Sequence, residues 1–315
     1  MPHTLPIEVQ LIVLEFAIAS LDAHTFESCQ DNLNSFSLVH RSWTKMAQQE
    51  LFQTLALNLS KWVDPVEVVK TRLDIAQRRG IVVQSLNLAA LPTSQDRRSV
   101  EGEAFVKLAT RLKNLDCLKL QLNCAAGPVV SCFKNLARLH YVFCGVPRDV
   151  WHTNFLLPIS LTHLHVEATE LYTLSLLPNL TSLVLGPGST IHRRAMSALP
   201  SLRIFKWDMT LPPYKPDCLD ALQALEELQV VFGEKTTIDA TLRKLTSSFP
   251  TRSPFSSLEV YISAGLLVPY LTMSDLQRWC QLKKVDLVVV RNFNLTCPVD
   301  PFLRPHARND KAVQT

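Results

Sequence analysis

One apolar pattern recurs along most of this chain and limits the folds that it can adopt. The pattern is apolar-x-x-apolar-x-apolar, and nine copies of it lie between residues 83 and 290. The copies begin at Val83, Leu115, Leu136, Leu161, Leu180, Leu202, Leu225, Leu258 and Leu282. Only the Leu258 copy departs from the pattern, because Ser263 takes its last apolar place. The first residues lie 19 to 33 residues apart, which indicates internal repeats.

The alternation within each copy predicts a short strand. The fourth and sixth positions would face a core, and the third, fifth and seventh would face the opposite side of a sheet. The segments LPNL, LPSL and LQAL precede three of the copies, where the chain would turn back into a strand. Over residues 81–295 the chain resembles the leucine-rich repeat family. The resemblance implies an irregular solenoid of the α/β class with a parallel concave sheet. An α/β domain with parallel strands and leucine-rich helices is the alternative.

Two segments flank the repeats. The sequence DPVEVVKTRLDIAQRRG predicts a helix with an N-cap at Asp64, Pro65 in its first turn, Glu67 completing a capping box and Gly80 at its end. Residues 58–80 would therefore be a bridging helix that closes one end of the repeat array. Residues 296–315 contain three prolines and no apolar period, which predicts a disordered tail.

The N-terminal segment LPIEVQLIVLEFAIA is apolar on more than one helical face. Val9, Ile12, Val13 and Phe16 form one stripe, and Leu11, Leu14 and Ile18 form another. A second apolar segment follows, with Phe36, Val39, Trp43 and Met46 at helical spacing. We expect about three short helices within residues 1–57. A unit of this size needs one face of each helix for its own core, so the spare stripe must contact the repeat domain or another protein.

The N-terminal residues also resemble a known family. Leu5, Pro6 and Glu8, then Leu38, Val39 and Trp43, then Leu51 and Phe52 follow the order of an F-box, although the link SLDAHTFESCQDNL is longer than in compact members. The chain is similar in this to the large fungal F-box families. The resemblance implies that Leu5, Pro6, Leu38, Val39 and Trp43 bind a Skp-type adaptor, and through it the cullin and RING subunits of an SCF-type ubiquitin ligase.

The repeats would then bind a protein target for ubiquitin-dependent degradation. The predicted register places Lys119, Arg138, His140, His163 and His165 on the concave face, where they would bind acidic or phosphorylated residues more strongly as the pH falls through about 6.5. Val184 and Ile204 would form an apolar spot beside them. An F-box scaffold that binds partners without promoting ubiquitylation is the alternative, and an enzyme with an unrecognised site is a third hypothesis.

The remaining composition favours a non-enzymatic protein without cofactors. The phosphate-binding, nucleophile-elbow and HExxH motifs are all absent from the sequence. His163 and His165 could suit a metal, but we interpret them as solvent-facing residues. None of the eight cysteines forms a CxxC pair, which predicts no zinc site and a reduced, cytoplasmic or nuclear location.

Charge and hydropathy exclude two further classes of partner. Residues 1–60 carry two basic and six acidic side chains, a net charge of −4. Because the whole chain carries +4, the remaining residues carry +8. This asymmetry indicates two regions, but it lacks the dense basic cluster of a nucleic-acid-binding protein. No apolar run reaches the length of a membrane-spanning helix, so we expect no membrane association.

Overall fold

The chain divides into two compact units, residues 52–294 and residues 1–51 with 295–315. The structure, a computed structural model, describes residues 53–58, 65–89, 110–122, 130–143, 149–151, 156–211, 219–233, 238–247, 254–263 and 270–293, and seven positions before residue 50. The fold below is that of the larger unit. Most residues of the expected N-terminal helices and all of the expected tail at 296–315 lie outside the described residues.

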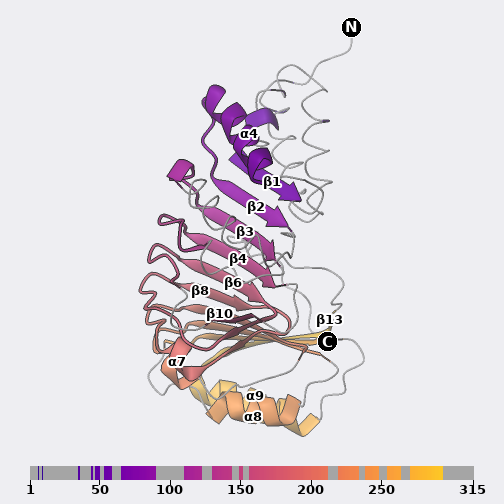
Figure 1. The fold of residues 1–315 in the computed structure, drawn as a ribbon. Helices are drawn as coiled ribbons and strands as arrows, with labels where there is room; N and C mark the ends of the chain where they lie inside the picture. Colours follow the sequence, from indigo (N-terminus) through magenta and orange to yellow (C-terminus); the bar gives the residue numbers. More distant parts are fainter. Residues whose placement is uncertain are drawn as a thin grey trace. The chain divides into compact units, whose positions relative to one another are not determined.

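Ten parallel strands form one open sheet, and their spatial order follows the chain (Figure 1). The strands are β1 (Thr54–Asn58), β2 (Ser85–Ala89), β3 (Cys117–Leu122), β4 (Arg138–Phe143), β6 (His163–Glu167), β8 (Ser182–Leu185), β10 (Ile204–Met209), β11 (Glu227–Phe232), β12 (Ser257–Ser263) and β13 (Asp286–Phe293). Every neighbouring pair is parallel. The α/β class and the large parallel sheet predicted from the sequence are therefore confirmed.

A smaller parallel sheet is formed by strands that alternate along the chain with the middle strands of the large sheet. It consists of β5 (Asp149–Trp151), β7 (Thr169–Leu171) and β9 (Thr190–Ile191). The chain enters β7 directly after β6 through Ala168, whose φ of 51° lies in the left-handed region. This bend lets one stretch of chain supply a strand to each sheet.

The core consists of the first, fourth and sixth positions of the repeated pattern. In the copy that contains β8 these are Leu180, Leu183 and Leu185, and all three are fully buried. The largest buried side chains, Trp207, Tyr141 and Phe205, occupy the same kinds of position in β10 and β4. Burial of each such side chain contributes about 1.5–3 kcal/mol. The sequence register is therefore confirmed for the copies between Val83 and Leu225.

The last two copies lie in a different register from the predicted one. Leu258 pairs with Leu228, a fourth position, so this copy starts at Phe255 and its alternating apolar residues are Leu258, Val260 and Ile262. Ser263 is thus no exception to the pattern, since Ile262 precedes it on the buried face. In the last copy Leu287 pairs with Leu258 and is therefore its fourth position. Leu282, the predicted first residue, belongs to a helix and is 76% exposed.

One strand was not predicted. The sequence analysis assigns residues up to 57 to the N-terminal helices, whereas β1 pairs with β2 along its whole length. The sequence around β1, FQTLAL from Phe52 to Leu57, also fits the apolar-x-x-apolar-x-apolar pattern and is therefore a further copy. The sequence analysis missed this copy because it assigned Leu51 and Phe52 to the end of the F-box pattern.

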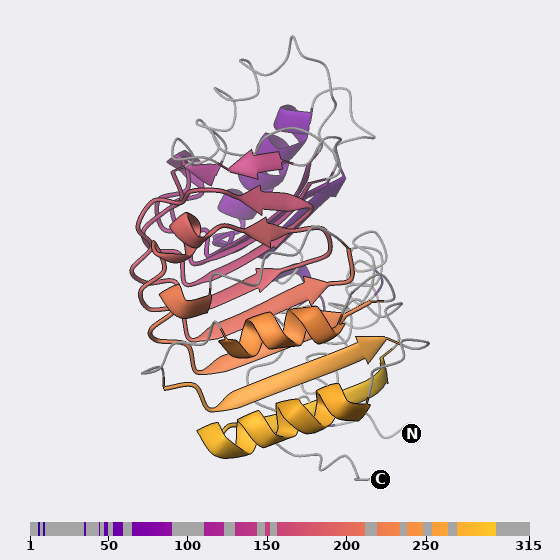
Figure 2. The same cartoon turned by 90° about the horizontal axis from the view of Figure 1, so that it is seen from below.

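Helices cover the two ends of the sheet. Helix α4 (Pro65–Arg78) connects β1 to β2 and buries Val69, Leu73 and Ala76. It matches the predicted helix, and Gly80 ends it with a φ of 68°; Asp64 lies outside the described residues. Helices α8 (Ile238–Ser247) and α9 (Tyr270–Lys283) lie side by side at the other end, next to β12 and β13 (Figure 2). The central connections include the short helices α7 (Arg193–Met196) and η3 (Leu219–Ala221), and the described residues Thr110, Arg111 and Val130 are also helical.

Candidate functional site

The sheet face opposite the core carries a row of polar and charged side chains. The strand register aligns the fifth positions of successive copies, and Lys119 pairs with His140, which pairs with His165. Lys119, His140 and His165, which the sequence placed on one face, thus form a row across three strands. The row continues through Val184 to Lys206. In the expected apolar spot, Val184 and Ile204 are diagonal neighbours on this face, since Ile204 pairs with Ser182 and Val184 pairs with Lys206.

Acidic side chains neutralise much of this face. Arg138 donates two hydrogen bonds to Oδ2 of Asp116, from Nε at 3.0 Å and from Nη2 at 2.6 Å. Asp116 precedes β3, so this pair joins two neighbouring repeats. The sequence analysis assigned target binding only to the basic members of the face. The alternation along the strands placed Arg138 on this face, but it makes no prediction for Asp116, which occupies the second position of its copy.

The predicted histidines divide into two environments. Nδ1 of His163 lies 2.9 Å from the hydroxyl of Thr162, and burial followed by the charge of Arg138 lowers the pKa of His163. His165 is 5% exposed, and its ring stacks on that of His140 with centroids 3.9 Å apart. Both of these rings point Nε2 toward Oε1 of Glu167, at 3.3 Å in each case. The structure thus pairs His165 with His140, and not with His163 as considered from the sequence.

Burial corrects the expected pH response of His165. It lowers the pKa of His165 well below 6.5, and the charges of His140, Lys119 and Lys206 lower it further. This imidazole is therefore neutral at pH 6.5 and adds no positive charge for an acidic target. The prediction treated His165 as solvent-facing, but the neighbouring ring and the Glu167 side chain cover it.

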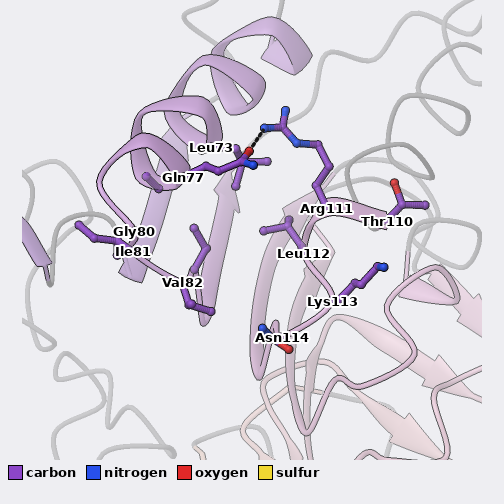
Figure 3. A pocket seen from close by; sticks show the side chains of 12 residues that line it. Leu73, Gln77, Gly80, Ile81, Val82, Thr110, Arg111, Leu112, Lys113 and Asn114 are labelled. Carbon is purple, nitrogen blue, oxygen red and sulfur yellow. Dashed lines mark hydrogen bonds between the residues drawn. The ribbon is translucent and has the colours of Figure 1, made fainter.

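A pocket of about 550 Å³ lies between α4 and the turn that precedes β3 (Figure 3). Its apolar lining includes Leu73, Ala76 and Leu112. Arg111 also lines the pocket and donates hydrogen bonds to Oδ1 of Asp74 at 2.5 Å and to Oε1 of Gln77 at 3.4 Å. This arrangement joins α4 to the next repeat and was not anticipated from the sequence.

Of the predicted adaptor-binding residues, the structure describes Pro6 alone, and Pro6 is exposed. Leu5, Leu38, Val39 and Trp43 lie outside the described residues. The described part of the same unit includes a helical Ala47 that is fully buried and a helical Val9 that is 40% exposed.

Comparisons with known proteins do not assign the chain to a family. No protein-family model matches it, and no curated protein matches its sequence. Among the described residues, no helix has both the length and the apolarity that crossing a membrane requires.

Proposed function

We propose that this protein is the substrate receptor of an SCF-type cullin–RING ubiquitin ligase. The N-terminal residues would bind a Skp-type adaptor as an F-box, and residues 81–295 would form a leucine-rich-repeat solenoid that binds a protein target. The observation that carries the proposal is the parallel sheet, in which each copy of the apolar pattern supplies the next strand in chain order. Repeat arrays of this kind present long surfaces to partners.

The proposed mechanism needs no catalytic group in this chain. The receptor would hold a target lysine near a ubiquitin-loaded conjugating enzyme borne by the RING subunit. Binding both in one assembly raises the effective concentration of the reactants, since the encounter becomes intramolecular. The sequence motifs of adaptor binding and the long repeat surface are consistent with this division of labour.

Adaptor binding can be tested with variants of the proposed F-box surface. Co-expression with a Skp-type adaptor should recover it with the wild-type chain, and Leu5→Ala/Pro6→Ala should reduce recovery at least about tenfold, the equivalent of 1.4 kcal/mol. The matched control is Ile159→Ala/Leu282→Ala, which removes apolar groups that are 65% and 76% exposed in the larger unit. Equal recovery with folded Leu5→Ala/Pro6→Ala protein would refute the interface.

A second experiment separates the receptor from a scaffold. Proteins labelled by proximity to the intact chain should gain ubiquitin in the reconstituted ligase, and residues 52–315, which keep β1, should not support this transfer. Binding of the same proteins without any ubiquitin transfer would favour the scaffold.

The target surface can be examined by charge reversal. Lys119 occupies the fifth position of β3 on the polar face, and we expect Lys119→Glu to weaken binding of an acidic target and to reduce its salt dependence. The exposed Lys134 precedes β4 in a turn at the edge of the sheet and supplies the control, Lys134→Glu. Equal effects of both variants would show that the polar face has no special part in target binding.

A further inference from the structure

Three side chains with metal-binding atoms meet on the polar face of β4 and β6. His140 and His165 are directly paired across the two strands, and Glu167 follows His165 by two residues on the same face. One ligand atom from each residue lies within 4.8 Å of the other two. Their side chains are 11%, 7% and 30% exposed, so the group is largely shielded from water.

The distances within this group match those between the ligands of a small tetrahedral ion. Zinc binds histidine nitrogen and carboxylate oxygen at about 2.0–2.2 Å, which places two ligand atoms roughly 3.3–3.5 Å apart at a tetrahedral angle. Oε1 of Glu167 lies 3.3 Å from Nε2 of His140 and 3.3 Å from Nε2 of His165. The two carboxylate–imidazole separations are therefore already near the value that such an ion requires, whereas the stacked imidazole rings would tilt toward each other so that both Nε2 atoms face one ion.

Gly186 provides the room that this arrangement needs. It directly follows β8, the strand beside β6. A Cβ at Gly186 would lie 2.4 Å from Cγ of Glu167 and 3.1 Å from Nε2 of His165, and both distances are too short for ordinary contact. Glycine here lets the Glu167 side chain lie across the sheet and reach the two imidazoles. This contact is independent of the histidine distances and indicates a built site.

The surroundings favour a metal that prefers nitrogen ligands. Two of the three ligand atoms that meet here are imidazole nitrogens, which suit zinc and similar transition metals. Lys119 and Lys206 flank the histidines along the row and oppose a cation, whereas Glu167 and Asp208 attract one. A hard oxygen-binding ion such as Ca²⁺ would find one carboxylate and no carbonyl cage among these three residues.

We propose that His140, His165 and Glu167 bind one divalent transition-metal ion, with zinc the best match, on the face of the sheet. Three protein ligands leave a fourth position for water or for a ligand atom of a bound molecule. This site is independent of the proposed ligase function, since it requires only the larger unit.

The test uses the full-length purified chain with zinc, and with Co²⁺ as a spectroscopic probe. After treatment with EDTA, calorimetry should show one equivalent of zinc bound at about 10 µM metal, and Co²⁺ should give the visible absorption of a tetrahedral complex. His140→Gln and Glu167→Gln should each weaken zinc binding at least about tenfold, because loss of a ligand costs no less than loss of its supporting partners. Gly186→Ala should also weaken binding, because its Cβ displaces Glu167.

Matched controls exclude adventitious surface sites. His163→Gln removes a histidine on the same strand and face, and His192→Gln removes one that pairs with Glu170. Both should bind zinc within about twofold of wild type. Circular dichroism in EDTA confirms folding, and Glu167→Gln keeps the test decisive if histidine variants fail to fold. The absence of a bound equivalent, or equal affinity in Glu167→Gln and His163→Gln, would overturn the site.

Discussion

The middle and the two ends of the large sheet bury the same leucine positions by different means. In the middle, a leucine-rich turn precedes each strand, as between Leu177 and Leu180, where the Leu180 amide donates to the Leu177 carbonyl at 3.3 Å. At the ends, the 14-residue helices α4 and α9 take the place of such turns. The difference indicates that interior repeats protect one another, whereas an end repeat requires an amphipathic helix to cover its exposed core.

Hydrogen bonds between successive turns hold the middle together. The residue before the first leucine of a copy donates its side chain to the preceding turn, as Asn135 does to the Lys113 carbonyl at 2.8 Å. Ser160 and Asn179 make the equivalent bonds to the carbonyls of Lys134 and Ile159. These bonds link three consecutive junctions. Polar residues at this one position therefore tie successive turns of the middle to one another.

The two end helices finish in the same way. After α4, Ile81 donates its amide to the Ala76 carbonyl and Gly80 donates to Gln77, and after α9, Val285 donates to Cys280 and Lys284 donates to Gln281. Both sets form a Schellman motif with a left-handed residue, Gly80 at 68° and Lys284 at 57°. The ends thus share a device, but only the first uses the residue that is best suited to it.

The largest effect is expected when the middle loses a core leucine. Leu183→Ala removes a fully buried side chain and should lower the free energy of unfolding by about 2–5 kcal/mol, whereas Leu276→Ala in α9, 2% exposed, should mainly release its own end. Urea unfolding and hydrogen exchange would measure this. Exchange should increase throughout the sheet in Leu183→Ala but only in α8, α9, β12 and β13 in Leu276→Ala. Identical exchange patterns would contradict the distinction between middle and end.

A second pair of variants tests the corrected register at the C-terminal end. Leu225 and Leu282 both begin a copy in the sequence, but Leu225 is fully buried and Leu282 is 76% exposed. Leu225→Ala should cost about 2–5 kcal/mol, and Leu282→Ala should stay within about 0.5 kcal/mol of wild type. Chemical denaturation is the measurement. Comparable losses would restore the register that the sequence suggested.

The sequence predicted the sheet well for the copies from Val83 to Leu225 and for the end of α4, which a glycine marks. Seven copies from Val83 to Leu225 have the expected register because their fourth and sixth positions leave no second choice of buried face. The Leu258 copy was misplaced because its true first residue is Phe255, so a leucine at the fourth position looked like the start. The Leu282 copy was misplaced because Lys284 ends α9 without the glycine that marks α4.

The polar face was less predictable than the core. Alternation along the strands aligned Lys119, His140 and His165, but it could not show that Glu167 turns back over His165. That contact depends on the space beside Gly186, and the apolar pattern does not reveal it. Burial of a polar side chain by its neighbours depends on such three-dimensional contacts, and a repeat pattern does not contain them.

Substitution of either left-handed residue should change the free energy of unfolding by a smaller amount. Lys284→Gly should stabilise the protein by roughly 0.5–1 kcal/mol, because the left-handed strain of about 1–2 kcal/mol exceeds the added flexibility of the unfolded chain. Gly80→Ala should destabilise it by about 1 kcal/mol, although no atom lies within 4 Å of the added Cβ. Thermal denaturation would measure both. Destabilisation by Lys284→Gly would mean that the lysine side chain holds the end of α9.

The smallest effect concerns a carboxyl group in the middle of the sheet. Asp208 accepts hydrogen bonds from the Thr210 amide at 2.9 Å and hydroxyl at 2.5 Å, and burial raises the pKa of Asp208 despite these bonds. Its protonated form is thus favoured by folding, and the associated stability is present below pH 3.8 and lost as the pH rises through the folded pKa. At pH 7 the buried charge opposes folding.

Replacing this carboxyl group by an amide should therefore stabilise the folded protein at neutral pH. Asp208→Asn keeps an oxygen acceptor for Thr210 and should raise the free energy of unfolding at pH 7 by about 0.5 kcal/mol, with a smaller gain near pH 4. The matched variant at the end of the sheet is Asp286→Asn, where the aspartate is exposed and no such trend is expected. Urea midpoints in EDTA at both pH values would compare the two. A gain for Asp286→Asn equal to that for Asp208→Asn would mean that the positive charge of the whole unit, and not burial in the middle of the sheet, sets the response.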